Sequence, residues 1–410
     1  MANRSLLTHI GLLAGIIEDG SPFLAGESMA VVNTIENAWL LMEDGMISDY
    51  GSMDSLPPRP EDAISQDCSG RIVMPAFCDS HTHLVFAGTR EIEYVDKIKG
   101  LSYEEIAKRG GGILNSAARM AEISGEKLLQ QSLERLDLIQ SYGTGAVEIK
   151  SGYGLNTASE LKMLRVIKQM KMMSPLTIKA TFLGAHAIPQ EYRGNPDKYV
   201  EVIVNEMIPA VAEENLADYV DVFCDKGFFT VPQTERILSV AGKYGLIPKI
   251  HANELGFSGG IQTGVKYKAL SVDHMEYTGD AEIRALRGSR TMPTLLPGAA
   301  FFLGMVDPPA RKMIEAGLPL AMASDFNPGS SPSGNMQLIW SFGCIKLRLT
   351  PDEAFNAITI NSAYAMGVEQ ELGSITRGKR ASLIITKPVP NLAYMPYAYG
   401  DNKVWKTLIS

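Results

Sequence analysis

The chain has 410 residues, of which 45% are hydrophobic and 20% are charged, a balance that excludes a mainly disordered protein. The formal net charge of -8 has the wrong sign for a nucleic-acid-binding surface, so we expect no nucleic-acid partner. The sequence contains no apolar run of about 18 residues and no evident signal peptide, so we expect a cytoplasmic protein that does not contact a membrane.

The predicted elements change character along the chain. Residues 1–70 alternate apolar and polar positions between turn signals, which predicts short antiparallel strands. From residue 72 onward, compact apolar runs alternate with stretches of helical periodicity, which predicts βαβ units. The runs cover residues 72–77, 146–149, 176–183, 219–224, 247–250, 270–272, 291–296 and 318–323. Eight such units predict an α/β fold of the (β/α)8 TIM-barrel type.

The last segment begins as a capped helix at Thr350 and then returns to strand-like sequence over residues 373–385. Strands at both ends of the chain can pair into one small sheet. We therefore expect two domains, with residues 1–70 and 355–410 forming the small β domain and residues 71–354 forming the barrel. An open doubly wound sheet is the alternative, but it normally has a glycine-rich turn after its first strand, where this chain has His-Thr-His.

Histidine is scarce, and five of the six histidines fall where predicted strands end. His81 and His83 follow the first run as a His-x-His pair, and in a strand such residues point to the same face. The other polar residues at strand ends are His186, His251, His274 and Asp325. A barrel places its active site at the carboxyl ends of its strands, so we expect these side chains to meet there. Imidazoles with a carboxylate suit a transition metal, whereas unrelated core or surface histidines would be scattered.

This arrangement resembles the amidohydrolase superfamily, whose fold is a TIM barrel beside a small β-sandwich made from both termini. The resemblance covers nearly the whole chain. Closer stretches resemble the imidazolonepropionase family within that superfamily. They are HTHLVFAGTRE at 81–91, GGGI at 110–113, EIKSGYGL at 148–155, LGAH at 183–186 and ASDFNPGS at 323–330. The resemblance implies a hydrolase of cyclic amides that converts 4-imidazolone-5-propanoate to N-formimidoyl-L-glutamate in histidine degradation.

By position, the resemblance implies a set of metal ligands. They are His81, His83, His251 and Asp325. The implied cofactor is one zinc or iron ion per subunit, which lowers the pKa of a bound water so that hydroxide attacks the ring carbonyl. Asp325 would also take a proton from this water. His274 would stabilise the oxyanion or serve as a further ligand, and Glu254 would contact a ring nitrogen or relay a proton to the leaving group.

The expected substrate is a small anionic molecule with a propanoate tail, for which a guanidinium is the preferred partner. Arg90 on the first loop is the implied cation, although alone it would resemble a surface ion-pair residue. The other implied substrate-binding residues are Tyr153, His186, Glu254, Asn327, Gly329 and Ser330, with Tyr103 as a further candidate. One departure from the family pattern is Asn253, where an aspartate is common.

Other members of the fold, catalytic and non-catalytic, are compatible with parts of the pattern. A deaminase of cytosine or guanine type shares the strand-five His-x-x-Glu arrangement and a single metal, but Arg90 favours an anionic substrate. Amidohydrolases with two metals use a carboxylated lysine that ends strand four, and here Lys226 lies a residue or two beyond that position. A non-catalytic assembly protein of the same fold would be expected to lose ligands, whereas every ligand type is present. We expect a homodimer, the commonest oligomer of soluble enzymes.

Overall fold

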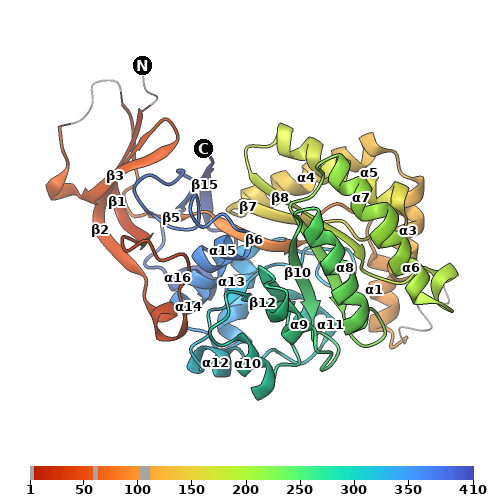
Figure 1. Cartoon of the computed structure of the whole chain (residues 1–410). Helices are drawn as coiled ribbons and strands as arrows, with labels where there is room; N and C mark the ends of the chain where they lie inside the picture. Colours follow the sequence, from red (N-terminus) through yellow and green to blue (C-terminus); the bar gives the residue numbers. More distant parts are fainter. Residues whose placement is uncertain (1–3, 59–62, 102–110) are drawn as a thin grey trace.

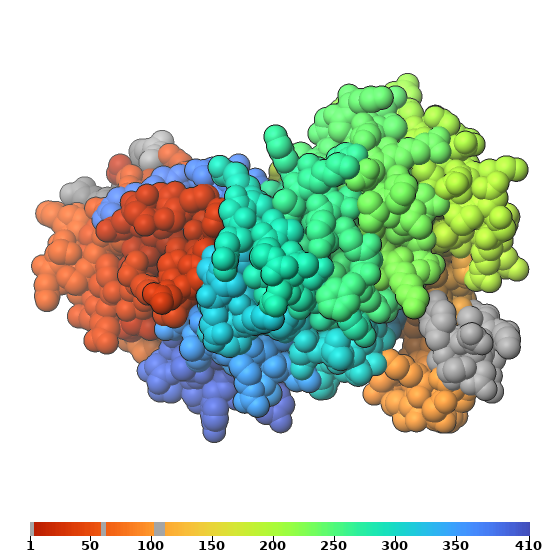
Figure 2. Space-filling model, turned by 60° about the horizontal axis from the view of Figure 1, so that its bottom comes forward, coloured from red at the N-terminus to blue at the C-terminus, as the bar shows by residue number. Residues whose placement is uncertain are grey.

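The computed structural model describes residues 4–58, 63–101 and 111–410. These residues form two sheets, an eight-stranded parallel sheet and a seven-stranded sheet that combines both ends of the chain. Figure 1 shows the second sheet at one end of the molecule and the barrel with its helices at the other. In Figure 2 the red N-terminal segments and the green barrel segments likewise occupy opposite ends. The predicted fold class is confirmed.

The barrel strands follow one another around the sheet in chain order. They are β6 (Phe77–Thr82), β7 (Thr144–Lys150), β8 (Thr177–Ala185), β9 (Tyr219–Cys224), β10 (Ile247–Ala252), β11 (Ser271–His274), β12 (Met292–Leu295) and β13 (Ala321–Met322). Backbone hydrogen bonds from Asp325 to His81 and from His83 to Phe326 join the last strand to the first. Seven of the eight predicted runs each supply one barrel strand, because strands covered on both faces are apolar almost throughout.

Helices surround the barrel strands, as Figure 1 shows. Those before β9 are α1 (Glu91–Ile98), α3 (Ile113–Glu122), α4 (Gly125–Ser141), α5 (Thr157–Met173), α6 (Pro196–Val202) and α7 (Ile208–Glu213). Those that follow are α8 (Val231–Lys243), α9 (Gly260–Lys266), α10 (Asp280–Leu286), α11 (Pro297–Leu303), α12 (Ala310–Glu315), α13 (Met336–Ile345), α14 (Pro351–Ile358), α15 (Ile360–Ala365) and α16 (Tyr394–Tyr397). No helix in the described ranges is long and apolar enough to cross a membrane.

The terminal sheet takes strands from both ends of the sequence. Its strands are β1 (Arg4–Ile16), β2 (Asn33–Glu43), β3 (Met46–Ser52), β4 (Ile64–Asp67), β5 (Ile72–Pro75), β14 (Leu383–Thr386) and β15 (Val404–Leu408). Strand β14 pairs antiparallel with both β5 and β15 and so attaches the C-terminus to the N-terminal strands. The division of the chain into domains at residues 70 and 354 stays a prediction.

One predicted strand is divided in two. The run at 72–77 was expected to form the first barrel strand, but its first part is β5 in the terminal sheet and its last residue begins β6. Both parts are fully buried, so hydrophobicity alone does not mark the break. The Ala76 amide between them donates to the Ser382 carbonyl of the terminal segment. This short connection fixes the start of β6, which carries His81, relative to the terminal sheet.

Candidate metal centre and active site

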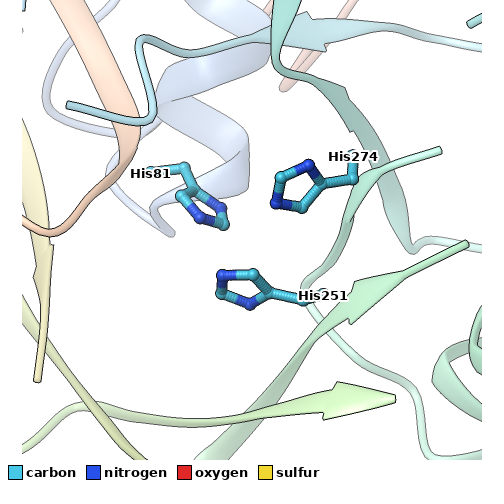
Figure 3. A group of neighbouring side chains, drawn as sticks. All are labelled: His81, His251 and His274. Carbon is cyan, nitrogen blue, oxygen red and sulfur yellow. The ribbon is translucent and has the colours of Figure 1, made fainter. Parts of the chain in front are cut away.

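The predicted metal-binding residues meet at the carboxyl ends of the barrel strands. His81 lies in β6 and His251 in β10, His83 directly follows β6, and Asp325 lies three residues after the end of β13. All four are buried, with at most 2% of each residue exposed. Figure 3 shows the rings of His81, His251 and His274 pointing into one shared space from different strands. The barrel therefore gathers residues that lie more than 240 positions apart in the sequence.

The geometry of these side chains suits a metal ion. The Nε2 atoms of His83 and His251 are 3.4 Å apart. Asp325 Oδ1 lies 3.5 Å from His83 Nε2 and 3.7 Å from His81 Nε2. Ligands bound tetrahedrally to one zinc ion at ordinary bond lengths lie about 3.3 Å apart, so these separations require little adjustment. His81 Nε2 and Asp325 Oδ1 are buried without hydrogen-bond partners, as expected for atoms that face a cation.

The protonation of the histidines also suits metal binding. Burial lowers the pKa of both His81 and His83 well below the ordinary value, so both rings are neutral. His81 Nδ1 lies 2.6 Å from Asp273 Oδ2, and His251 Nδ1 lies 2.9 Å from Asp221 Oδ2. A ring nitrogen that faces a carboxylate carries the hydrogen, which leaves the Nε2 lone pair free for a metal.

The cluster offers more ligand atoms than one tetrahedral ion takes. Three groups have all their ligand atoms within 4.8 Å of one another. They are His81 with His251 and His274, His83 with His186 and His251, and His81 with His83 and Asp325. The structure is therefore compatible with both roles expected for His274, that of a further metal ligand and that of a group that stabilises the oxyanion.

His274 lies between two carboxylates. Its Nε2 is 3.5 Å from Glu254 Oε2 and its Nδ1 is 3.7 Å from Glu276 Oε1. Burial alone would lower the pKa of His274, but Glu254 and Glu276 outweigh this effect and raise it to about 10. Burial raises the pKa of Glu254 to about 7. At neutral pH the pair thus holds a proton on the imidazole beside a carboxyl group that exchanges protons readily.

Three residues at this centre have backbone conformations that are uncommon outside glycine. The φ angles are +80° at His274, +71° at Met275 and +52° at Asp325. Such conformations cost energy and persist where the surrounding structure enforces them, often at functional sites. Here they turn the chain sharply at the ends of β11 and β13, where His274 and Asp325 reach the cluster.

A cavity of about 400 Å³ opens over the cluster. Eleven of the twelve predicted site residues line it. They are His83, Arg90, Tyr153, His186, His251, Glu254, His274, Asp325, Asn327, Gly329 and Ser330. The exception, His81, is fully buried at the base of the cluster. Apolar walls come from residues that the sequence did not single out, Ile113, Phe223, Phe228, Leu255 and Leu303.

Arg90 provides a positive charge on the cavity wall. Its guanidinium donates to Ser116 Oγ through Nε and Nη2, at 2.9 and 2.7 Å. A Cβ atom on Gly329 would overlap Arg90 Nη1, so a larger residue there would displace the guanidinium from this position. The guanidinium carbon also lies 5.6 Å from the centre of the Tyr153 ring. These contacts hold the guanidinium in the cavity rather than in a surface ion pair.

The turn after Asp325 is held by Asn327. Its Oδ1 accepts hydrogen bonds from the amides of Gly329 and Ser330, both at 2.8 Å. Its Nδ2 donates to the Asp325 carbonyl and to Ser330 Oγ. Ser330 Oγ donates in turn to Asp325 Oδ2 at 3.3 Å. The turn therefore fixes the Asp325 carboxylate and places Ser330 at the cavity wall.

Tyr153 and His186 form the side of the cavity next to His83. The His83 and His186 rings are stacked with their centres 5.0 Å apart. His186 Nδ1 donates to the Gly152 carbonyl at 3.0 Å, and Gly152 has a φ of +111° that disfavours other residues. Tyr103, the further candidate, lies outside the described residues.

The structure accounts for Asn253 and Lys226, the two residues that depart from patterns of related amidohydrolases. Asn253 has a φ of +57°, a region that asparagine tolerates, and its Nδ2 donates to the Tyr277 carbonyl at 2.8 Å. Its Oδ1 accepts a hydrogen bond from the Ser258 hydroxyl. These are bonds between neighbouring loops, for which an amide suffices. Lys226 is exposed, as expected for a surface lysine.

Sequence reasoning missed several polar residues beneath and beside the cluster. Ser116 and Glu276 each contact one predicted site residue. Beneath the cluster lies a buried group of charged residues, Glu148, Lys150, Asp221, Lys249 and Asp273. The available signal was their placement, since charged side chains in otherwise apolar strands must have partners.

A TIM barrel with three histidines and an aspartate converging at its strand ends defines a hydrolase of the amidohydrolase class. A family model described as "Amidohydrolase family" matches residues 243–409. Imidazolonepropionase from Flavobacterium johnsoniae is 52% identical over 405 residues, which cover 99% of this chain and 98% of that protein. Imidazolonepropionase from Christiangramia forsetii is 51% identical over 399 residues, which cover 97% of each. The chain belongs to the imidazolonepropionase family.

Solved structures of other hydrolases share the fold at low sequence identity. Guanine deaminase from E. coli has a TM-score of 0.74 with 14% identity, covering 99% of this chain and 97% of that chain. A triazine hydrolase variant has a TM-score of 0.76 with 14% identity, covering 99% and 93%. These similarities support the barrel and the terminal sheet, and the much higher identities to imidazolonepropionases separate the chain from the deaminases.

Proposed function

We propose that this protein hydrolyses the cyclic amide bond of 4-imidazolone-5-propanoate to give N-formimidoyl-L-glutamate. The observation that carries the proposal is a single cavity with a His–Asp cluster at its base and the Arg90 guanidinium on its wall. A metal hydrolase site explains the cluster, and a carboxylate on the substrate explains the guanidinium. The names of the family's members point to the same substrate.

His81, His83, His251 and Asp325 would hold one zinc or iron ion. When bound, the ion supplies a Lewis acid that lowers the pKa of water and polarises the ring carbonyl. Asp325 is positioned to accept a proton from the attacking water, because its Oδ1 is free of hydrogen bonds and faces the cluster. Asn327 and Ser330 keep the Asp325 carboxylate in this orientation.

The other residues bind the substrate and move protons. Arg90 pairs with the propanoate, and Ser330, Tyr153 and His186 surround it with hydrogen-bonding groups. The protonated His274 donates to the carbonyl oxygen as negative charge develops there. Glu254 delivers a proton to the ring nitrogen that leaves when the amide bond breaks, a role that its pKa of about 7 suits.

A direct assay tests the proposed function. The purified full chain, supplied with zinc or iron, is incubated with 4-imidazolone-5-propanoate, and N-formimidoyl-L-glutamate is followed over time. Cytosine and guanine are offered in parallel reactions. The proposal predicts turnover of the imidazolone alone. Release of ammonia from guanine or cytosine without formation of N-formimidoyl-L-glutamate would show a deaminase instead.

Replacing Arg90 by alanine is expected to raise KM by about 10- to 100-fold, because a charge-assisted hydrogen bond contributes about 1.5–3 kcal/mol. The value of kcat should change less, since the propanoate lies away from the bond that breaks. Arg119→Ala is the matched control, as Arg119 donates to the Thr89 carbonyl on the same loop but does not line the cavity. Steady-state kinetics with both variants measures the difference, and an unchanged KM for Arg90→Ala would rule out the assigned contact.

The choice between zinc and iron, one ion per subunit, a homodimer and a cytoplasmic location stay predictions. Elemental analysis of the purified protein identifies the metal and its stoichiometry. Sedimentation equilibrium gives the number of subunits, and cell fractionation gives the location.

A further inference from the structure

The charged residues beneath the metal site form one connected cluster inside the barrel. It contains Glu148, Lys150, Asp221, Lys249 and Asp273, and none of these residues is exposed. Lys150 Nζ lies 2.6 Å from Glu148 Oε1, and Lys249 Nζ is paired with the other oxygen of the same carboxylate. Three carboxylates thus share two ammonium groups. Ion pairs this deeply buried add little net stability compared with an apolar core, so the cluster calls for another explanation.

Lys150 connects the two carboxylates that contact predicted metal ligands. Its Nζ is 2.8 Å from Asp221 Oδ2 and 3.7 Å from Asp273 Oδ2. The same Asp221 oxygen lies 2.9 Å from His251 Nδ1, and the same Asp273 oxygen lies 2.6 Å from His81 Nδ1. A continuous path therefore runs from one ligand ring through a carboxylate, the ammonium group and a second carboxylate to the other ligand ring.

Each carboxylate also has a second partner that restrains it. Asp221 Oδ1 accepts a hydrogen bond from the His251 amide at 3.0 Å, and Asp273 Oδ1 accepts one from the Ser271 hydroxyl at 2.6 Å. The remaining oxygen of each is the one that faces both Lys150 and a histidine. The ammonium group thus restrains the carboxylate oxygen that lies nearest to each histidine Nδ1.

We propose that Lys150 is a positioning residue that aligns His81 and His251 together for one metal ion, acting through Asp273 and Asp221. The inference rests on the proposed metal site and adds a residue to it. Carboxylates behind histidine ligands fix the orientation of the ring and typically change metal affinity by about 10- to 100-fold when they are lost. A single ammonium group that orders two of them couples two ligands from strands β6 and β10.

The neighbouring lysine provides a matched comparison. Lys249 Nζ donates to the Ser80 and Ala365 carbonyls, both at 3.1 Å, and pairs with Glu148. Its bonds therefore go to two backbone carbonyls and to Glu148. Both lysines are fully buried and paired with Glu148, and among the described residues only Lys150 also forms ion pairs with Asp221 and Asp273.

Two double variants of the full chain test the proposal. Lys150→Met/Glu148→Gln and Lys249→Met/Glu148→Gln each remove one ammonium group and the same carboxylate, so the formal charge of the cluster is preserved in both. Each protein is stripped of metal and titrated with Co²⁺ against a competing chelator, while the visible absorption of the bound Co²⁺ reports its coordination. Circular dichroism and thermal unfolding confirm that each variant folds.

The Lys150 variant is expected to bind Co²⁺ about 10- to 100-fold more weakly than the parent chain, with altered absorption bands. The Lys249 variant is expected to keep the parent's affinity and spectrum. Equal changes in both variants, or parent-like Co²⁺ binding by the Lys150 variant, would overturn the proposal. If the Lys150 variant does not fold, Asp221→Asn and Asp273→Asn provide the test. Each single variant must bind Co²⁺ more weakly than the parent chain. The double variant must lose less binding free energy for Co²⁺ than the two single losses added together.

These measurements do not depend on the assigned substrate. A parent chain that binds Co²⁺ but does not hydrolyse the imidazolone would remove the proposed function and leave the role of Lys150 intact. If the parent chain hydrolyses the imidazolone and replacing Lys150 does not change Co²⁺ binding, the proposed function stands and the role of Lys150 is removed.

Discussion

Replacing Asp325 by asparagine is expected to lower kcat by about 10³-fold or more and to leave the purified protein with less than one metal ion per chain. The charged Oδ1 lies 3.5–3.7 Å from two ligand nitrogens and has no hydrogen-bond partner of its own. An amide of the same shape removes the negative charge that a metal ligand and a proton acceptor both need. Because asparagine is isosteric and Asn327 still holds the turn, the variant should fold.

The matched control is Asp280→Asn at the exposed start of α10, where the carboxylate pairs with Lys312. It should keep both the metal content and kcat of the parent chain. Elemental analysis and steady-state kinetics are measured for both variants. Full metal occupancy in Asp325→Asn with a large loss of kcat would show that Asp325 acts on protons only, and an unchanged kcat would remove it from the site.

The arrangement of the site could be predicted because the fold fixes which residues meet. Residues such as His81 and His251 are far apart in sequence, but parallel strands in a barrel direct all their carboxyl ends to one face. Locating polar residues at the ends of apolar runs was therefore enough to identify the cluster. Arg90, by contrast, was predicted only from the resemblance to a family motif, since loop residues follow no periodicity.

The residues that were missed share a physical cause. Lys150 and Asp221 lie within strands, where a charged side chain is normally excluded, and their partners come from other strands. Glu276 and Ser116 lie after β11 and on α3, and each reaches the site only through the tertiary fold. The break between β5 and β6 was missed because burial on both sides of Ala76 leaves no polar residue to mark it. Sequence periodicity reports burial and does not report which buried groups are paired.

Replacing His274 by asparagine is expected to lower kcat by about 10²- to 10³-fold, the usual cost of removing one donor to a developing oxyanion. In contrast to Asp325→Asn, the metal content should stay at the parent level. The reason is the position of the ring between Glu254 and Glu276, which raise its pKa to about 10 and so keep a proton on the ring at neutral pH. A protonated imidazole is a hydrogen-bond donor and a poor metal ligand.

His9→Asn is the matched control, because His9 lies in the terminal sheet beside Asp67, far from the cluster in the fold. It should change neither the metal content nor kcat. Loss of metal from His274→Asn would instead make His274 a ligand, in agreement with its ligand atom lying within 4.8 Å of those of His81 and His251. Comparing the substitutions of Asp325 and His274 therefore separates holding the metal from stabilising the reacting carbonyl, two roles that strands β13 and β11 place within one cluster.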